Sequence, residues 1–518
     1  MNTKLTQRTN KEFPISVLLT AMFGLTVLRS AWVAEDAYIT LRTIDNFVNG
    51  YGLTWNVAER VQAYTHPLWM LALSVPYFFT REAFYTSIFL SLITSIIAFF
   101  IVLKMLHRPT YATIAGLCVL IFSKAFIDFS TSGLENPLTH LLLAIFLYIY
   151  FEQPDTYDNK MIFWLSFVAG LAVTNRMDTI LFFTPALIFV SFKRRSWSGI
   201  KWMIIGFLPF FLWEFFSVFY YGFPFPNTAY AKLNTGLSRF DLLEAGYFYF
   251  INSIHWDPIT LFIITTALIL TFFQERWHEK FIALGVLLYL MYIIWIGADF
   301  MSGRFFSGAL LVAVVLFNRY VKNISFLHGL IILVLVIGLG LISPSPTLSS
   351  IDELSFPARK MDLNGIADER SFYFQSSSLI YAKRNTISPY NDWANLGKQL
   401  KADGIKYDQL ENIGYAGYFA GPQIFIIDRL ALADPLLSHL PPIPNENWRI
   451  GHFERAIPDG YFESIKHADN RISNPNLAIY YDKLRLATRG SLWSPKRLIA
   501  IWDLNTGRMD NFLKNYNP

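Results

Sequence analysis

Twelve apolar stretches constrain what this chain can fold into more strongly than any other feature of its sequence. They occupy, roughly, residues 14–32, 67–80, 85–103, 111–127, 137–151, 160–174, 178–192, 201–219, 259–273, 281–297, 305–318 and 325–344. Such segments cross bilayers as helices, because a backbone in lipid must satisfy its hydrogen bonds within itself. Only 16% of the 518 residues are charged, whereas a soluble domain averages about 25%. We therefore predict a polytopic α-helical membrane protein.

Basic residues in the short loops set the predicted orientation, because Lys and Arg gather on the cytoplasmic side of membranes. The amino terminus is expected in the cytoplasm because basic residues precede the first stretch, namely Lys4, Arg8 and Lys11. No small-residue cleavage site follows that stretch, so we expect an uncleaved span. The same rule leaves the chain after residue 344 outside. Twelve crossings would put both termini on one side, so we expect about 11 spans, with 13 as the upper alternative. Either one stretch is re-entrant or two stretches form one kinked helix.

The composition changes at Ser343–Pro346, after which the chain is polar and carries short β-prone runs such as 424–427. This change predicts two domains. Residues 1–344 form a transmembrane catalytic domain with a first outer loop at 33–66, and residues 345–518 form an extracytoplasmic mixed α/β domain. The single cysteine, Cys118, excludes an intrachain disulfide, so the outer domain must fold without one.

An adjacent carboxylate pair, Glu35 and Asp36, directly follows the first apolar stretch. Carboxylates at the mouth of a membrane bundle are costly to hold there and therefore indicate function. Such a group can accept a proton or stabilise an oxocarbenium-like sugar centre. We take Asp36 as the first candidate for a catalytic carboxylate, with Glu35 supporting it, orienting it or helping to bind a divalent cation. The alternative is a charged helix end at the membrane surface.

Four cations near the outer ends of apolar stretches are candidates for binding a phosphate group: Arg42, Arg176, Lys232 and Arg304. A planar guanidinium matches phosphate geometry well. The alternatives are a headgroup anchor for Arg42 and simple ion pairs with nearby acids for Arg176 and Arg304.

Six further polar or aromatic residues are candidates for sugar or acceptor binding: His66, Glu135, Asp178, Asn227, Tyr230 and Asp299. Sugar sites combine such groups, with rings packing on sugar faces and amides bonding to hydroxyls. Glu135 is alternatively a helix-start charge favoured by the helix dipole, and Asp178 and Asp299 are alternatively ion-pair partners of the nearby arginines.

The sequence contains no convincing P-loop, dinucleotide fingerprint, zinc spacing or nucleophile elbow. The missing nucleotide-binding pattern fits a lipid-linked donor, because nucleotide-sugars are not expected outside the cytoplasmic membrane. Dispersed basic residues favour topology setting over nucleic-acid binding.

Taken together, these segments resemble the membrane arabinofuranosyltransferases of the GT-C superfamily, above all the mycobacterial and corynebacterial terminal arabinofuranosyltransferases and their Gram-negative relatives. The matching segments are 35–42, 55–56, 59–61, 64–69, 131–137, 176–178, 226–232, 299–304, 414–418, 428, 434–435 and 451–455. Two positions depart from the family pattern. Glu35 stands where the family usually has Asp, and His66 stands where Asn is expected.

The resemblance implies a decaprenyl- or undecaprenyl-phosphate sugar donor, an outer active site between the first loop and the bundle, and Asp36 as the catalytic acid. It implies a multi-pass protein of the bacterial inner (plasma) membrane that contacts membrane lipids and an extracytoplasmic acceptor, either a glycan or a pilin-like protein. No cofactor is certain. A divalent cation (Mg, Mn or Ca) held by Glu35 and Asp36 is left open.

Our main hypothesis is the transfer of a pentofuranose, with D-arabinofuranose as first choice, from a polyprenyl phosphate to that acceptor. One alternative is another lipid-linked sugar, such as mannose or aminoarabinose. A second is a lipid or polysaccharide transporter, although transporters carry charges near the bilayer midplane and broken helices in paired halves. A third is a scaffold that only binds glycan.

Overall fold

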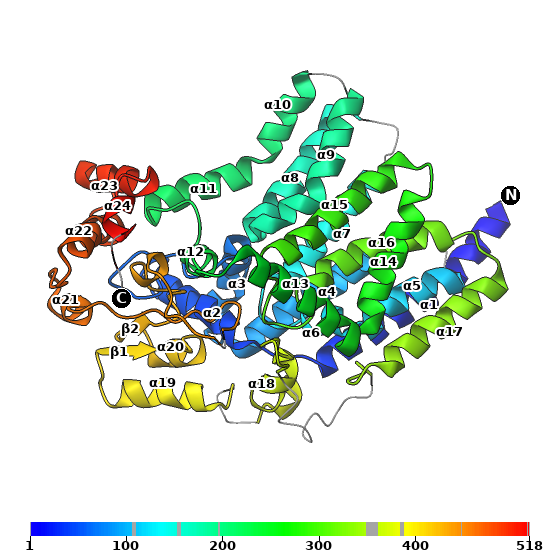
Figure 1. Ribbon diagram of the computed structural model, residues 1–518. Coiled ribbons are helices and arrows are strands. Elements are labelled where there is room, and N and C mark those ends of the chain that lie inside the picture. The colour runs from blue at the N-terminus through cyan, green and yellow to red at the C-terminus, as the bar shows by residue number, and fades with distance from the viewer. Residues whose placement is uncertain are drawn as a thin grey trace. The chain divides into compact units, whose positions relative to one another are not determined.

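The computed structural model describes residues 2–105, 110–152, 157–194, 197–348, 361–383, 388–446, 448–514 and 516, with side chains from residue 15 onward. The basic side chains near the amino terminus that set the predicted orientation, Lys4, Arg8 and Lys11, therefore lie outside the described part. The described chain is mostly helical (Figure 1). It divides into two compact units. Unit 1 comprises Met1–Ala34, Phe84–Phe210 and Arg239–Ser388, and unit 2 comprises Glu35–Ala83, Phe211–Ser238 and Pro389–Pro518. The predicted boundary at residue 344 falls inside unit 1.

Unit 1 is a helical bundle. Its helices are α1 (Asn2–Arg29), α4 (Phe84–Met105), α5 (Tyr111–Phe122), α6 (Lys124–Asp128), α7 (Asn136–Glu152), α8 (Asn159–Asn175), α9 (Ile180–Arg194), α10 (Trp197–Gly206), α13 (Arg239–Trp256), α14 (Pro258–Phe272), α15 (Trp277–Trp295), α16 (Phe306–Val321), α17 (Phe326–Ile342) and α18 (Glu369–Ser377). A short 3-10 turn, η1 (Met177–Thr179), joins α8 to α9.

Helix α16 lies at the centre of unit 1. Every side chain from Phe306 to Asn318 is buried, as expected for a helix that is apolar on all sides. Helices α5, α7 and α14 pack on it, while α4 packs on α7 and α15 packs on α9. The α9–α15 contact is close, because a Cβ on Gly285 would come within 2.3 Å of the Phe182 carbonyl oxygen. Small residues at such crossings let helix backbones approach, as is common in membrane bundles.

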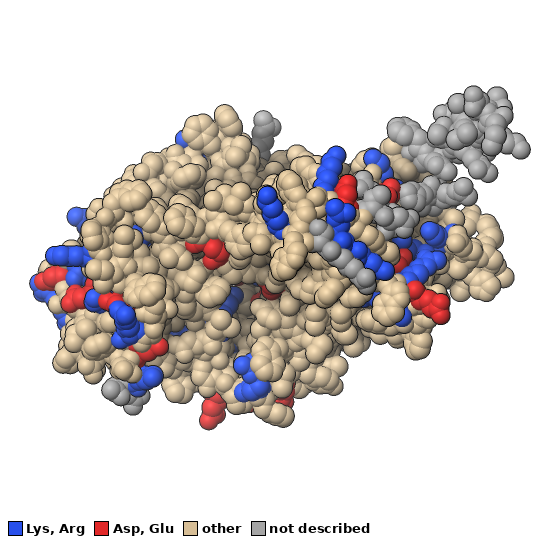
Figure 2. Space-filling view, turned by 90° about the horizontal axis from the view of Figure 1, so that it is seen from above, with Lys and Arg blue, Asp and Glu red and all other residues tan. Residues whose placement is uncertain are grey.

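The apolar helices indicate a membrane protein, as predicted. Within the described residues, α4 and α15 are long and apolar enough to cross a membrane, and two bent pairs, α10 with α11 (Leu208–Tyr220) and α13 with α14, raise the number to four. Shorter apolar helices are α3 (Pro67–Thr80), α5, α16, α17 and residues 15–29 of α1. The predicted count of about 11 spans is not confirmed. Figure 2 shows wide uncharged areas between groups of charged side chains on one face.

Unit 2 is also mainly helical. It contains α2 (Glu35–Val48), α3, most of α11, α12 (Asn227–Leu233), α19 (Asp392–Ala402), α20 (Tyr415–Ala420), α21 (Tyr461–His467), α22 (Pro475–Arg489), α23 (Pro495–Asn505), α24 (Asp510–Lys514) and the strands β1 (Tyr407–Leu410) and β2 (Phe425–Asp428). The two strands pair in parallel, from Tyr407 opposite Phe425 to Leu410 opposite Asp428. With only these strands among the described residues, the predicted mixed α/β domain is not confirmed.

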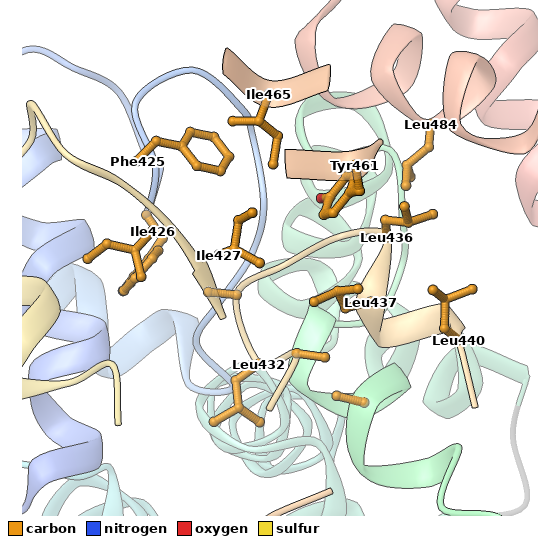
Figure 3. Packing of buried hydrophobic residues seen from close by; sticks show 14 of the residues in the cluster. Phe425, Ile426, Ile427, Leu432, Leu436, Leu437, Leu440, Tyr461, Ile465 and Leu484 are labelled. Atoms are coloured by element: carbon orange, nitrogen blue, oxygen red, sulfur yellow. The ribbon is translucent and has the colours of Figure 1, made fainter. Parts of the chain in front are cut away.

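The hydrophobic core of unit 2 surrounds β2, whose residues are all buried. Figure 3 shows the side chains that meet there, which come from β2, the segment after it, α21 and α22 and include Phe425, Ile427, Leu436, Leu437, Tyr461, Ile465 and Leu484. Burying an aliphatic or aromatic side chain of this size contributes about 1.5–3 kcal/mol. The same core includes Ile39 of α2 and Trp55 of the first loop, so this loop is part of unit 2.

Candidate functional site

The two predicted carboxylates form the first turn of α2, where the positive end of the helix dipole favours negative charge. Glu35 is buried and Asp36 is half-buried. The Glu35 carboxylate has a defined structural task. Its Oε1 accepts hydrogen bonds from the backbone N–H groups of Gly414 (2.6 Å) and Tyr415 (3.2 Å), which are the first donors of α20. Glu35 therefore caps α20.

Gly414 is the residue that makes this cap possible. A Cβ at this position would lie 2.1 Å from the Glu35 carbonyl oxygen and 2.6 Å from Glu35 Oε1, so no side chain fits. The Gly-Tyr-Ala-Gly-Tyr segment, 414–418, which contributed to the resemblance, thus lies against the start of α2.

A divalent cation would need ligands beyond this pair. Glu35 Oε1 already accepts two N–H groups. Among the described residues, no group of three or more His, Cys, Asp or Glu side chains is arranged to hold a metal ion. Glu35 thus fits a capping role better than a ligand role, and no step below passes through a metal. The cation considered from the sequence stays a prediction.

Arg42, predicted to bind phosphate, is fully engaged inside unit 2. Its Nε donates to the Trp55 carbonyl (2.9 Å), its Nη1 to the Gly417 carbonyl (2.5 Å) and its Nη2 to the Ile424 carbonyl (2.8 Å). The guanidinium also stacks on the Trp55 ring at 4.2 Å, and burial lowers its pKa to about 9. Arg42 thus joins α2 to α20 and β2, and we leave it out of the proposed phosphate-binding set.

His66 lies at the start of α3, directly before Pro67, and is buried. Its Nε2 is 2.8 Å from the Thr40 hydroxyl. Thr40 is four residues after Asp36 on α2, so both belong to the same helix face. The structure therefore brings His66 to the face of α2 that carries the candidate catalytic carboxylate.

Helix α12 carries the predicted residues Asn227, Tyr230 and Lys232. Asn227 is buried, and its Nδ2 donates to the carbonyls of Ala431 (2.9 Å), Leu432 (3.2 Å) and Asp434 (3.0 Å). This amide fixes α12 to the segment after β2. The Tyr230 ring is half-buried and stacks on His439 at 4.9 Å.

Lys232 is half-buried and belongs to a group of cations. Burial and the nearby positive charges of Arg449 and Lys232 lower the pKa of His452 to about 3. Burial thus keeps the His452 imidazole neutral, and the positive charges of Arg449 and Lys232 add to this effect. The field of these two charges favours an anion. Arg449 and His452 were not among the predicted site residues, although His452 lies in the 451–455 segment of the resemblance.

Five predicted residues meet in one charged network in unit 1. The Glu135 carboxylate accepts from Arg176 (2.7 Å) and Arg304 (3.1 Å). Arg176 also forms a forked contact with Asp178, at 2.8–2.9 Å, and Arg304 Nη1 lies 3.4 Å from Asp299. Three acids face two arginines, so the net formal charge is −1.

The local structure explains how these five residues meet. Glu135 directly precedes α7, and the turn before it needs the positive φ of Gly133, +77°. Arg176 and Asp178 lie at the break between α8 and α9, and Arg304 precedes α16. Both short-range ion pairs named as alternatives are present, but Glu135 joins them into one network.

A second buried network in unit 1 was missed from the sequence. Lys124 Nζ lies 2.6 Å from Asp128 Oδ2 and 3.1 Å from Asp368 Oδ2, and Arg370 Nε lies 2.6 Å from Asp128 Oδ1. Two acids balance two bases, and the network ties α6 to α18. The only signal was the i, i+4 spacing of Lys124 and Asp128 at the end of an apolar run, because their partners lie far along the chain.

Comparison with known proteins bears directly on the predicted resemblance. The chain is 25% identical to the terminal beta-(1->2)-arabinofuranosyltransferase of Mycobacterium tuberculosis, in an alignment covering 85% of this chain and 83% of that protein. It is 24% identical to the Corynebacterium glutamicum protein of the same name, over 81% of this chain and 72% of that protein. The predicted resemblance is confirmed. The expected class of enzyme, a glycosyltransferase, is confirmed with it. No family model matches the chain.

Most of the segments that carry the resemblance belong to unit 2. The Asn56 side chain bonds both the carbonyl (3.0 Å) and the N–H (3.1 Å) of Ile426, as a neighbouring strand would. Arg455 is buried and donates to the carbonyls of Leu440, Ala231 and Asn234. These residues hold the first loop, α12 and the carboxyl-terminal segment together around β2.

Proposed function

We propose that this chain transfers an arabinofuranosyl group from a polyprenyl-phosphate donor to an extracytoplasmic acceptor. The observation that carries the proposal is the similarity to two arabinofuranosyltransferases over more than four fifths of the chain. The chain's many apolar helices suit a donor that is itself embedded in a bilayer, and the acceptor would be a glycan or a pilin-like protein.

Asp36 is the proposed catalytic carboxylate. The acceptor hydroxyl attacks C1 of the sugar, a new C1–O bond forms, and the bond from C1 to the phosphate oxygen breaks. The hydroxyl proton passes to Asp36, and the polyprenyl phosphate leaves with the bonding electron pair. Glu35 supports this role indirectly, since it fixes the first turn of α2 by capping α20. Fixing a reacting group in place is a large part of catalysis.

The leaving phosphate needs positive charge. Lys232 and Arg449 are the proposed donor-phosphate contacts in unit 2, because the positive charges of both act on a buried, neutral His452 there. In unit 1, Arg176 and Arg304 already share three carboxylates. They remain candidates through the N–H groups that a guanidinium keeps after its first bonds, since each has five. A phosphate bound to either arginine would lie close to the Glu135 carboxylate, with which both arginines pair.

The orienting contacts to sugar and acceptor are proposed for side chains near these groups. His66 is held by Thr40 on the Asp36 face of α2. The Tyr230 ring lies at the edge of a small pocket that is lined also by Arg60, Gln62, Phe223 and Phe225. An aromatic wall with amide and guanidinium groups beside it suits a sugar ring.

The test is transfer from synthetic polyprenyl-phosphoryl-arabinofuranose to a panel of arabinan and pilin acceptors by the full-length protein. We expect wild type to transfer and Asp36→Asn to lose transfer by at least about 100-fold, the usual scale for a catalytic proton acceptor. The matched control is Asp45→Asn. Asp45 lies on the same helix, and its Oδ1 accepts from the Tyr77 hydroxyl at 2.7 Å, a bond that an amide oxygen preserves.

The possible outcomes separate the alternatives. Equal transfer by wild type and a folded Asp36→Asn protein would remove Asp36 from the mechanism. Transfer from lipid-linked mannose or aminoarabinose, with none from the arabinose donor, would keep the enzyme class and overturn the sugar. No transfer from any donor, with movement of lipid-linked sugar across a vesicle membrane, would favour a transporter.

A further inference from the structure

One face of α23 exposes large apolar side chains, whereas the apolar side chains around β2 in the same unit are buried. Leu498, Ile499 and Trp502 are 44%, 57% and 59% exposed, and Trp493, two residues before the helix, is 78% exposed. Positions 498 and 499 precede position 502 by four and three residues, so all three lie on one side of the helix. We call these four residues the α23 apolar face. The opposite side of α23, with Arg497, Ala500 and Ile501, is buried.

Hydrogen bonds hold α23 on the rest of unit 2, so its apolar face is not exposed merely because the carboxyl-terminal segment is detached. The buried guanidinium of Arg497 donates to the carbonyls of Ala487 (2.8 Å), Phe219 (2.8 Å) and Tyr220 (2.9 Å). Asn505 donates to the Gly222 carbonyl at 2.8 Å. These bonds attach α23 at both of its ends to the last turn of α11 and the chain that follows it.

The apolar surface continues from α23 onto α11. The Trp493 ring packs on Phe219 of α11, with centroids 4.9 Å apart. Along α11, Phe211, Leu212 and Phe215 are exposed. Together with α10, this helix is long and apolar enough to cross a membrane. Its exposed side chains therefore suit lipid, and the α23 apolar face begins where this lipid-facing surface ends.

The charges of α23 fit the surface of a bilayer. Lys496 is exposed beside the apolar face, where it can reach lipid phosphates. The acid of the helix, Asp503, is neutralised by Lys483 at 2.9 Å and Arg508 at 3.2 Å. Tryptophan is enriched at membrane–water interfaces, where its ring is buried and its N–H stays wet. Amphipathic helices with Trp and Leu on one face and Lys at the edge bind in the plane of that interface.

We propose that α23 is an interfacial membrane helix whose apolar face enters the boundary between lipid headgroups and acyl chains. The α23 apolar face contacts the bilayer surface in this proposal. The reason is that it continues onto the exposed side of α11, which together with α10 is long and apolar enough to form a span. The contact would hold unit 2, with Asp36 on α2, at the membrane surface where a lipid-linked substrate is presented. The inference stands on α11 and α23 alone and does not depend on which sugar is transferred.

The chain has a single cysteine, so replacing it lets one new cysteine be labelled at a chosen position. In a Cys118→Ala background, a nitroxide is attached to Ile499→Cys or Trp502→Cys in the full-length protein. The protein is placed in nanodiscs of phosphatidylethanolamine and phosphatidylglycerol. Relaxation of the label by oxygen, which concentrates in lipid, is compared with relaxation by a water-soluble nickel chelate. The matched control is Lys401→Cys, an exposed position at the end of α19 in the same unit.

We expect oxygen to dominate at positions 499 and 502 and the nickel chelate to dominate at 401. Dominance of the nickel chelate at 499 and 502 would place the face in water and overturn the proposal. Exclusion of both reagents would mean that protein covers the face, a second copy included, and would also overturn it. Each labelled protein is first compared with the Cys118→Ala protein by gel filtration, and Leu498→Cys replaces any variant that aggregates.

Discussion

Replacing Arg42 with lysine separates a structural role for this residue from the phosphate-binding role that its position suggests. Arg42 gives one nitrogen to each of three backbone carbonyls, on Trp55, Gly417 and Ile424. A lysine ammonium carries the same charge but cannot reach three carbonyls in that fork-shaped geometry. The Trp55 carbonyl would keep a second donor, Asn46 Nδ2 at 3.1 Å, but at least one of the Gly417 and Ile424 carbonyls would lose the donor that Arg42 provides.

The magnitude follows from these contacts. A buried polar group left without a partner costs about 1–3 kcal/mol. The stacking on Trp55 at 4.2 Å adds about 0.5–2 kcal/mol. With one carbonyl unpaired and the stacking lost, we expect Arg42→Lys to lower the free energy of unfolding by about 1.5–5 kcal/mol, which is a large part of the stability of an ordinary domain.

The assay is thermal unfolding of the purified protein in nanodiscs, read together with the KM for a polyprenyl-phosphoryl-sugar donor. We expect a strongly lowered unfolding temperature, with a donor KM close to wild type in whatever fraction remains folded below the transition. Lys401→Arg, an exposed exchange of the same two residue types, should leave both values unchanged. An unaltered unfolding temperature with a raised KM would refute the structural role and return Arg42 to the phosphate site.

Three further predictions concern single contacts. Gly414→Ala should destabilise unit 2 by at least about 2 kcal/mol, because its Cβ would overlap Glu35; an unchanged unfolding temperature would contradict the capping geometry. Burial raises the pKa values of Asp428 and Asp434 to about 7, above the unfolded value of about 3.9. The folded state therefore binds more protons between these values, and the unfolding temperature should fall as pH rises from about 4 to about 7, with a weaker dependence in Asp434→Asn. Arg370→Met should cost about 3–5 kcal/mol, because it leaves a buried acid without its arginine, and Arg370→Lys should recover part of the loss in the same unfolding assay.

Local patterns in the sequence predicted helices well and long-range contacts poorly. The apolar stretch at 67–80 coincides with α3, and the stretch at 111–127 begins where α5 begins. In contrast, α13 was not predicted, because Asp241 and Glu244 interrupt its apolar pattern. The predicted β-prone run at 424–427 overlaps β2, but a strand pair alone does not make a mixed α/β domain.

In the candidate site, too, the contacts between residues far apart in the sequence were not predicted. The Arg176–Asp178 and Asp299–Arg304 pairs are separated by two and five residues, so the sequence alone suggested them. Glu135 joins them from 41 and 169 residues away, a contact that depends on the packing of three helices. Glu35 was predicted as an acid of the active site, and its cap on Gly414, 379 residues later, depends in the same way on tertiary structure.

The interleaved composition of unit 2 has a consequence for the order of events during synthesis. Its three segments, Glu35–Ala83, Phe211–Ser238 and Pro389–Pro518, are separated by most of unit 1. The first loop therefore emerges from the ribosome long before β2, the partner that its Trp55 and Asn56 require. Chain elongation in cells proceeds at about 5–20 residues per second. The segments that contact α2 are therefore synthesised tens of seconds after Asp36. During that interval the growing chain can bind chaperones at the membrane surface. Unit 2 can assemble only after its third segment, Pro389–Pro518, has been synthesised.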